Sequence, residues 1–269
     1  GESALFEAIT HAADQVGNLA SPAIAGFGSP GVLHPESGAI VHKTPNLRLP
    51  ADFPMRTRLE QVLGKRVVID NDANCAALAE HVAGAARGAH VSLTVTVGTG
   101  VGCGIVTGGR VMRGSFGGAG EIGHMALGSL GPACGCGVVG CAEPMASGSG
   151  LVARAREAGL LVTGAREVFE SDDPRAAAVI DRMVDHLARM LGAATALLNP
   201  DVIVVGGGVA QAGERLFGPL REHCKRYMLA SHWTGLRIVP ALLGEQAGVI
   251  GAGLSAWQAH TQGRRRDDA

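Results

Sequence analysis

Apolar residues recur at two different spacings along the chain, and the two spacings alternate. In residues 3–16, side chains such as Leu5, Ile9 and Val16 fall on one face of a helix. The same spacing predicts helices at 55–63, 73–86, 149–158, 164–170, 174–198, 213–229 and 247–260. Short apolar runs bounded by turn residues predict strands at 23–27, 66–70, 91–97, 103–106, 110–113, 202–205 and 237–242. Because strands alternate with helices, the pattern indicates an α/β fold.

Two segments depart from this alternation. Residues 91–109 carry no charge and are long enough to cross a bilayer, but they contain six glycines and several hydroxyl side chains. We interpret them as two strands around a glycine loop rather than as a membrane span. Residues 114–150 show no apolar periodicity and predict a long ordered loop, which is usually a functional one.

Composition narrows the class of protein. Apolar residues make up 46% and charged residues 17% of the 269 residues, so a disordered chain is excluded. The net charge is -1, and most of the 23 basic residues are scattered arginines, which argues against a nucleic-acid partner. The first residues show no signal peptide, so the expected location is the cytoplasm, without a membrane partner. The 41 glycines indicate many tight turns and close backbone approaches.

Glycine-rich turns raise the question of a nucleotide site. The segment 98–104 reads G-T-G-V-G-C-G between two apolar runs, so its N–H groups could cradle an anion, or it could be a plain tight hairpin. Gly206, Gly207 and Gly208 follow a buried strand and would let a ligand ring approach the backbone, or they form an ordinary turn. Two literal G-x-G-x-x-G matches, at 26–31 and 135–140, lack the strand and helix context of a dinucleotide site, and no Walker A motif is present.

A cysteine cluster gives the clearest chemical signal. His124 is followed by Cys134, Cys136 and Cys141, and one imidazole with three thiolates completes a tetrahedral zinc site. Four protein ligands leave no open position, so the zinc would be structural. A disulfide in the C-x-C segment and a chance cluster are the alternatives. Cys75, Cys103 and Cys224 are isolated, and we expect them to be ordinary core residues.

Carboxylates lie next to this cluster and at the end of one predicted strand. Glu121 and Glu143 flank the cysteine segment, where they could bind a polar ligand or simply face water. The turn D-N-D-A-N at 70–74 follows a buried strand, where ligands of open α/β folds bind. Asp72 is placed to act as a base, and Asn71 offers both a donor and an acceptor. The alternative is a helix N-cap cluster, with Asp72 or Asn74 as the cap.

Together these motifs resemble the ROK family of sugar kinases and repressors. The resemblance covers residues from about 22 to 255, and it rests on G-x-G-S-P-G (26–31), D-N-D-A-N (70–74), G-T-G-x-G-x-G (98–104), E-I-G-H (121–124), C-G-C-G-x-x-G-C-x-E (134–143) and N-P-D-x-I-x-x-G-G-G (199–208). It implies an actin-like ATPase (ribonuclease H-like) α/β fold with two domains. We expect a small domain at 1–71, completed by helix 256–269, and a larger domain at 72–255 with the zinc motif.

The resemblance also implies an activity. The chain would phosphorylate the 6-hydroxyl of a hexose or N-acetylhexosamine with ATP and Mg²⁺, as a homodimer or homotetramer. Asp72 would be the catalytic base, and the implied sugar-binding residues are Gly31, Thr44, Asn71, Asp72, Glu121, His124 and Glu143. The residues implied to bind ATP are Gly98, Thr99, Gly100, Gly102, Gly104, Gly207 and Gly208. The implied zinc ligands are His124, Cys134, Cys136 and Cys141.

Two departures from the family pattern qualify this expectation. Cys103 stands where the family usually has glycine in its second phosphate loop. The family also opens with a strand hairpin bearing D-x-G-G-T, which binds ATP phosphates and contributes to the Mg²⁺ site, and nothing in this sequence matches it. We therefore expect weak or no phosphoryl transfer from the chain as written, as a truncated kinase. A non-catalytic sugar sensor and a zinc-stabilised scaffold are the alternatives.

Overall fold

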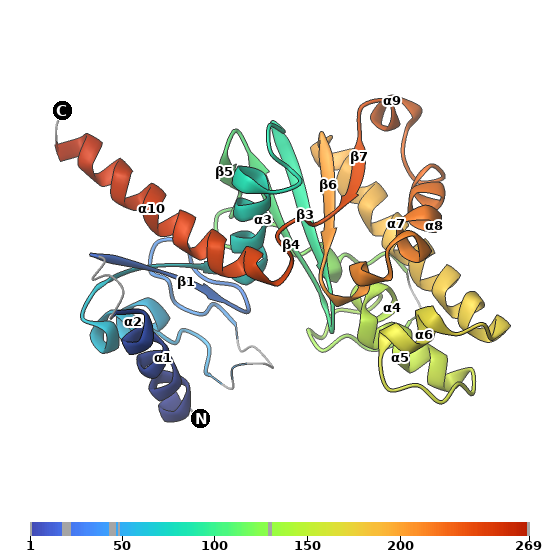
Figure 1. The fold of residues 1–269 in the computed structure, drawn as a ribbon, viewed down its shortest axis with the longest axis horizontal. Helices are drawn as coiled ribbons and strands as arrows, with labels where there is room; N and C mark the ends of the chain where they lie inside the picture. Colours follow the sequence, from blue (N-terminus) through green and yellow to red (C-terminus); the bar gives the residue numbers. More distant parts are fainter. Residues whose placement is uncertain (1, 18–22, 43–46, 48, 129–130, 268–269) are drawn as a thin grey trace.

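The strands of the protein form two separate sheets. The structure, a computed structural model, describes residues 2–17, 23–42, 47, 49–128 and 131–267 (Figure 1). The small sheet pairs β1 (Ile24–Ser29) with β2 (Arg66–Asn71) in parallel. The large sheet has the order β5-β4-β3-β6-β7 and comprises β3 (Val91–Val97), β4 (Val101–Thr107), β5 (Arg110–Val111), β6 (Val202–Gly206) and β7 (Arg237–Pro240). The strands β3, β4 and β5 are antiparallel, whereas β3, β6 and β7 are parallel.

Helices cover both faces of the large sheet, and two more lie beside the small one. The helices of the described chain are α1 (Glu2–Gly17), α2 (Met55–Leu63), α3 (Asp72–Ala83), α4 (Glu143–Ala146), α5 (Gly148–Glu157), α6 (Ala165–Glu170), α7 (Pro174–Leu198), α8 (Glu214–Cys224), α9 (Ala230–Trp233) and α10 (Ala247–Asp267). Figure 1 shows α4 to α8 on one side of the sheet and α3 with α10 on the other, while α1 and α2 lie beside the small sheet. None of the described helices is long and apolar enough to cross a membrane.

The main core lies between the large sheet and α7. The strand β6 is an uninterrupted V-I-V-V run and is buried along its whole length, as a central parallel strand requires. Alternate side chains of β6 and β3 belong to one cluster with the apolar face of α7. Its fully buried members include Leu93, Val95, Leu187, Leu191, Ile203 and Val205. The uncharged stretch 91–109 is thus the β3–β4 hairpin of a packed sheet, as predicted.

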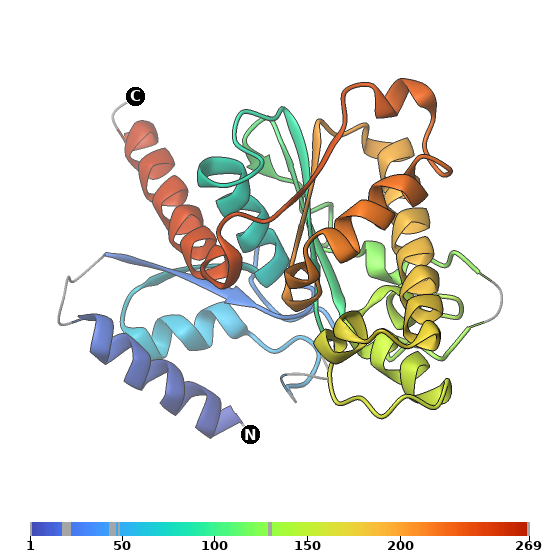
Figure 2. The same cartoon turned by 45° about the vertical axis from the view of Figure 1, so that its right-hand side comes forward.

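Helix α10 connects the two sheets through close backbone contacts. It crosses β1 and packs beside α3, as Figures 1 and 2 both show. A Cβ atom on Gly26 of β1 would lie 1.9 Å from the carbonyl oxygen of Ala252, and one on Gly251 would lie 1.7 Å from that of Cys75. Neither position has room for a side chain, so glycine is required for the three elements to meet.

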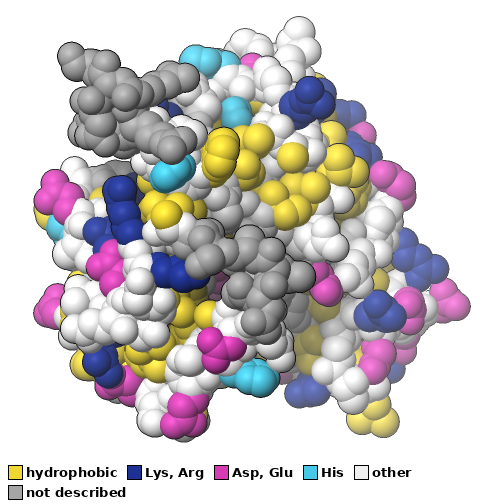
Figure 3. Space-filling model, turned by 60° about the vertical axis from the view of Figure 1, so that its left-hand side comes forward, with side chains coloured by type: hydrophobic (Ala, Val, Ile, Leu, Met, Phe, Trp, Pro, Cys, Tyr) yellow, Lys and Arg dark blue, Asp and Glu magenta, His cyan; other side chains and the backbone are white. Residues whose placement is uncertain are grey.

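The outer face of α10 is partly apolar. Val249 is 79% exposed and Trp257 is 65% exposed, two helical turns apart. The space-filling view of this side of the molecule shows hydrophobic side chains at the surface among charged ones (Figure 3).

Most predicted elements agree with the structure, and the differences are local. The α/β class is confirmed, and the bounds of 55–63, 91–97 and 174–198 match. The helix expected at 213–229 ends at Cys224, followed by the short α9. The loop 114–150 contains a 3-10 turn η1 (Ile122–His124) and α4, both too short for a periodic pattern. The cap of α3 is Asn71, not Asp72 or Asn74, because Asn71 is the last residue with extended backbone.

Candidate active site

A cavity of about 720 Å³ lies between the two sheets, where most of the residues singled out from the sequence come together. Its walls come from the ends of β1 and β2, the first turn of α3, the β3–β4 loop and the segment 117–124. The sequence-predicted residues that line it are Gly31, Asn71, Asp72, Gly98, Thr99, Gly100, Gly102, Glu121, His124, Cys136, Glu143 and Gly207. Thr44 lies outside the described residues, and Gly104 and Gly208 do not line this cavity.

The acidic turn places one carboxylate at the start of a helix. Asp72 is the first residue of α3, and its Oδ1 accepts the N–H of Ala73 at 2.8 Å. Burial raises the pKa of Asp72, and the backbone hydrogen bonds reduce this shift without cancelling it. A carboxylate with a raised pKa is a stronger base, and it faces the cavity.

Asn71 has a structural task in addition to its place in the cavity wall. Its Oδ1 accepts the N–H groups of Ala73 (2.9 Å) and Asn74 (3.3 Å), and its Nδ2 donates to the carbonyl oxygen of Gly31 at 3.1 Å. Asn71 is therefore the helix cap in place of the expected Asp72 or Asn74, and its amide also links the end of β1 to the turn. Only its second N–H hydrogen is left to meet a ligand.

The β3–β4 loop presents free N–H groups. The N–H of Val101 donates to Oε2 of Glu143 at 2.9 Å, and that of Gly98 donates to the carbonyl oxygen of Gly100 at 3.0 Å. Within the described part of the chain, the N–H groups of Thr99 and Gly100 have no acceptor. Gly104 is different, because it lies within β4 and a Cβ there would approach Ala77 of α3 to 2.4 Å. Glycine is required at this position because α3 packs closely against β4.

Two further carboxylates face the same space. Burial raises the pKa of Glu121, and the nearby Glu143 and Asp72 add to the rise, while His124 lowers it. Glu143 is held by the Val101 N–H, and a Cβ on Gly100 would lie 2.6 Å from its Oε2. Among the described residues that line the cavity, the only basic side chains are those of His42 and His124, with no lysine or arginine.

The three cysteines of the 134–141 segment lie close to His124. The ligand atoms of His124, Cys134, Cys136 and Cys141 all lie within 4.8 Å of one another, so the four residues could hold a metal ion. Nδ1 of His124 lies 3.6 Å from Sγ of Cys134, and its Nε2 lies 3.7 Å from Oε2 of Glu121. Cys75, Cys103 and Cys224 are buried free thiols, and burial raises the pKa of each to about 12, as expected of core residues.

A second cavity, of about 490 Å³, adjoins the first and contains Gly207 and Gly208. Gly207 has φ +84°, and a Cβ there would lie 2.4 Å from the carbonyl oxygen of Val97, so only glycine fits. The buried carboxylate of Glu80 also borders this cavity and accepts the N–H groups of Ala85, Leu242 and Leu243. It thereby fastens the loop after β7 to α3.

The sequence analysis missed several wall residues of the first cavity. They are Pro30, Val32, His42, Thr96, Gly117 and Ala119. Gly117 must be glycine, because its φ is +83° and a Cβ there would lie 1.9 Å from the carbonyl oxygen of Leu33, but this requirement is visible only in the structure.

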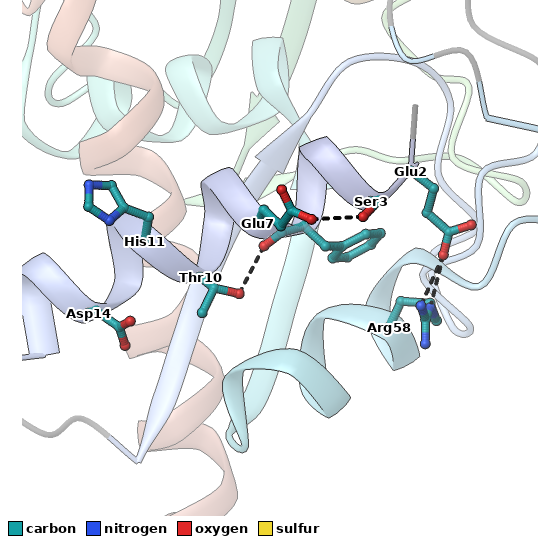
Figure 4. Close-up of a pocket in the computed structure, with 8 residues that line it drawn as sticks. Glu2, Ser3, Glu7, Thr10, His11, Asp14 and Arg58 are labelled. Atoms are coloured by element: carbon teal, nitrogen blue, oxygen red, sulfur yellow. Dashed lines mark hydrogen bonds and ion pairs between the residues drawn. The ribbon is translucent and has the colours of Figure 1, made fainter.

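A third cavity, of about 660 Å³, is unrelated to these sites. It lies at the surface between α1 and α2, where Glu2 pairs with Arg58 at 3.0 Å (Figure 4). None of the sequence-predicted site residues lines it.

Comparison with known proteins identifies the family. The ROK family profile matches residues 2–259. The chain belongs to the ROK family. This ROK chain is 40% identical over 247 residues to a glucokinase of Halalkalibacterium halodurans, covering 85% of the chain and 74% of that protein. It is also 37% identical over 189 residues to an N-acetylmannosamine kinase of Vibrio cholerae, covering 70% and 65% respectively.

Solved structures of ROK proteins share the fold. A ROK hexokinase from Thermus thermophilus superposes with a TM-score of 0.85 at 38% identity, covering 97% of this chain and 88% of that one. A ROK glucokinase from Streptomyces griseus, in complex with glucose and AMPPNP, gives a TM-score of 0.83 at 31% identity, with 95% and 88% covered. The predicted actin-like ATPase fold is confirmed by these ROK sugar kinases.

Proposed function

We propose that the chain catalyses ATP-dependent phosphorylation of the 6-hydroxyl of a hexose or N-acetylhexosamine. The observation that carries this proposal is the position of Asp72, a carboxylate with a raised pKa that shares one cavity with Glu121, Glu143 and the β3–β4 loop. The named relatives, a glucokinase and an N-acetylmannosamine kinase, support the same reaction class.

The substrate is a neutral polyol in this proposal. Carboxylates, an amide and an imidazole line the cavity, and each can accept or donate a hydrogen bond to a hydroxyl group. A substrate that already carried a phosphate would need arginine or lysine, and no such side chain is among the described lining residues. Glucose, N-acetylglucosamine and N-acetylmannosamine are therefore the candidates.

The reaction would run as a single displacement. Asp72 accepts the proton of the 6-hydroxyl while that oxygen attacks the γ-phosphorus of ATP, and the bond to the ADP oxygen breaks. Glu121, Glu143, His124 and Asn71 would hold the other hydroxyls, and Gly31 would lie near the sugar, whereas Thr44 lies outside the described residues. The free N–H groups of Thr99 and Gly100 point to a phosphate cradle, with Gly98 and Gly102 beside them in the cavity wall, and Gly207 with Gly208 would flank the adenosine. Mg²⁺ bound with ATP would neutralise phosphate charge.

Zinc is the metal we propose for the cysteine cluster. Thiolates and imidazoles in tetrahedral sets are typical of structural zinc, and the four donor atoms are close enough together to surround one ion. With Nδ1 of His124 directed to the cluster, its Nε2 carries the hydrogen and faces Glu121 and the cavity. The metal would thereby orient a sugar-binding imidazole.

The decisive experiment is a phosphorylation assay with ATP and each of the three sugars. It uses the chain as written, the same chain preceded by a D-x-G-G-T strand hairpin, and Asp72→Asn in both. We expect weak or no turnover from the first, turnover from the second, and loss of that turnover in Asp72→Asn. An active chain whose rate is unchanged by Asp72→Asn contradicts the assignment of the base.

A sugar sensor is the second candidate function. The chain is 31% identical over 244 residues to a Caldicellulosiruptor protein whose name assigns it to xylose repression, covering 84% of the chain and 60% of that protein. Calorimetric sugar binding without turnover in the extended chain would favour this function over the kinase.

A further inference from the structure

Asp70 is a buried carboxylate two residues before the proposed base. It is 4% exposed, near the end of β2, and both of its oxygens are engaged. Its Oδ1 accepts the backbone N–H of Asn71 at 2.8 Å and the Nδ2 of Asn74 at 2.9 Å. Asp70 therefore holds the Asn71 backbone before Asp72 and the Asn74 side chain after it.

The second oxygen of Asp70 binds an arginine that is distant in sequence. Oδ2 accepts Nη2 of Arg113 at 2.6 Å and Nε of Arg113 at 3.0 Å. Arg113 follows β5 of the large sheet, and its carbonyl oxygen accepts the N–H of Ala119 at 3.1 Å. The loop that Arg113 anchors lines the cavity at Gly117 and Ala119 and leads directly into Glu121.

The arrangement links the two sheets at the reacting groups. Since Asp70 is almost fully buried, a missing partner would leave an uncompensated charge inside the protein. The turn would then relax to find other donors or water, and Asn71 and Asp72 would move with it. Small displacements of a reacting group are costly, because proton transfer requires hydrogen-bond distance to the hydroxyl.

We propose that Arg113 is a positioning residue, which acts through Asp70 to hold Asp72 and the segment of Glu121 in their reactive arrangement. The inference rests on the proposed kinase function for its kinetic consequence, but its geometric consequence does not depend on turnover. Arg113 does not line the cavity among the described residues, so it is not a catalytic residue itself.

The test compares Arg113→Gln and Arg113→Lys with the unchanged chain, in the more active of the two forms assayed above. We expect Arg113→Gln to lower kcat about 100-fold, because a displacement of the Asp72 carboxylate by about 1 Å has an effect of this size. The KM for sugar should change less than about threefold, because the wall residues remain. Arg113→Lys should recover about tenfold in kcat, since lysine keeps the charge without the two-pronged contact.

Two controls separate positioning from general stability. Arg189→Gln removes another arginine–carboxylate pair, with Asp185 on α7 at 2.7 Å, outside the cavity wall, and should leave kcat unchanged. In a chain that already carries Asp70→Asn, Arg113→Gln should lower kcat by less than a further factor of about three, because the two residues act as one unit. Additive losses in this cycle, or an equal loss in Arg189→Gln, would overturn the proposal.

Crystal structures of the unchanged chain and of both Arg113 variants provide the readout that needs no activity. We expect the Asp72 carboxylate to shift in Arg113→Gln and to return in Arg113→Lys. If Arg113→Gln does not fold, a smaller shift in Arg113→Lys with a reduced kcat supports the proposal. An unmoved Asp72 overturns the proposal whatever the rate. If neither the chain as written nor the extended chain phosphorylates a sugar, the proposed function is contradicted, while the crystal structures still decide the role of Arg113.

Discussion

Replacing Glu80 tests whether a buried carboxylate stabilises the fold beside the second cavity. Its side chain is fully buried in α3, where Oε2 accepts the N–H groups of Ala85 (2.7 Å) and Leu242 (3.2 Å) and Oε1 accepts that of Leu243 (2.8 Å). Glutamine has the same shape but one acceptor oxygen. In Glu80→Gln, the new NH₂ group must therefore face at least one of these three N–H groups, which are partly buried.

The contacts give the size of the effect. One buried N–H group without an acceptor costs about 1–3 kcal/mol, so we expect Glu80→Gln to lower the free energy of unfolding by about 2 kcal/mol. For a chain of 269 residues this corresponds to a fall in Tm of about 4 °C. Glu80→Ala deprives all three N–H groups of their acceptor and should cost about 5 kcal/mol.

Urea unfolding and scanning calorimetry measure these differences, with the exposed Glu170→Gln as the matched control. Because the loop at 242–243 continues into the wall of the second cavity, the KM for ATP should rise in Glu80→Gln while the KM for sugar stays unchanged. A Glu80→Gln protein as stable as the original would refute the reasoning, because it would mean that a neutral side chain satisfies the same three donors.

Three further predictions concern the first cavity. Cys136→Ser, or a strong chelator, should remove zinc and abolish sugar binding measured by calorimetry. The control variant Cys224→Ala should retain one metal per chain. Sugar binding in fully zinc-free protein would contradict the supporting role of the metal. Gly100→Ala places a Cβ 2.6 Å from Oε2 of Glu143 and should lower kcat/KM for sugar about tenfold. The control is Gly235→Ala, whose new Cβ meets no atom within 4 Å. Equal kcat/KM in the two variants would count against this prediction. Partial desolvation in the cavity raises the pKa of Asp72 above its ordinary value of 3.8. The proposed base therefore becomes protonated at a higher pH than an aspartate of ordinary pKa, and kcat/KM should fall at that higher pH; an acid limb at or below about pH 4 would disprove this.

The elements that the sequence predicted best are those with both a long pattern and clear ends. The helix at 174–198 begins at a proline with Asp173 as its cap and ends at Asn199 before Pro200, so its bounds follow from side-chain chemistry. The site motifs were also recognisable, because glycine loops and acidic turns at strand ends are local features. The fold then brings them together at one cavity.

What the sequence could not show are contacts between distant segments. Arg113 and Glu80 look like isolated surface charges in the sequence, yet Arg113 pairs with a residue 43 positions away and Glu80 accepts N–H groups 162 and 163 positions away. Asn71 was recognised as a polar site residue, but its capping bonds depend on the backbone angle at the end of β2. Such roles become visible only when the partners are placed in space.

The acidic character of the first cavity has a consequence for the end of the reaction. A neutral sugar enters a space lined by Asp72, Glu121 and Glu143, but the phosphorylated product would leave it as an anion. Like charges in a partly buried space repel, and no lysine or arginine among the described lining residues offsets that repulsion. The same carboxylates that we propose to bind the hydroxyl groups would therefore favour product release, so we expect weak inhibition by the phosphorylated product.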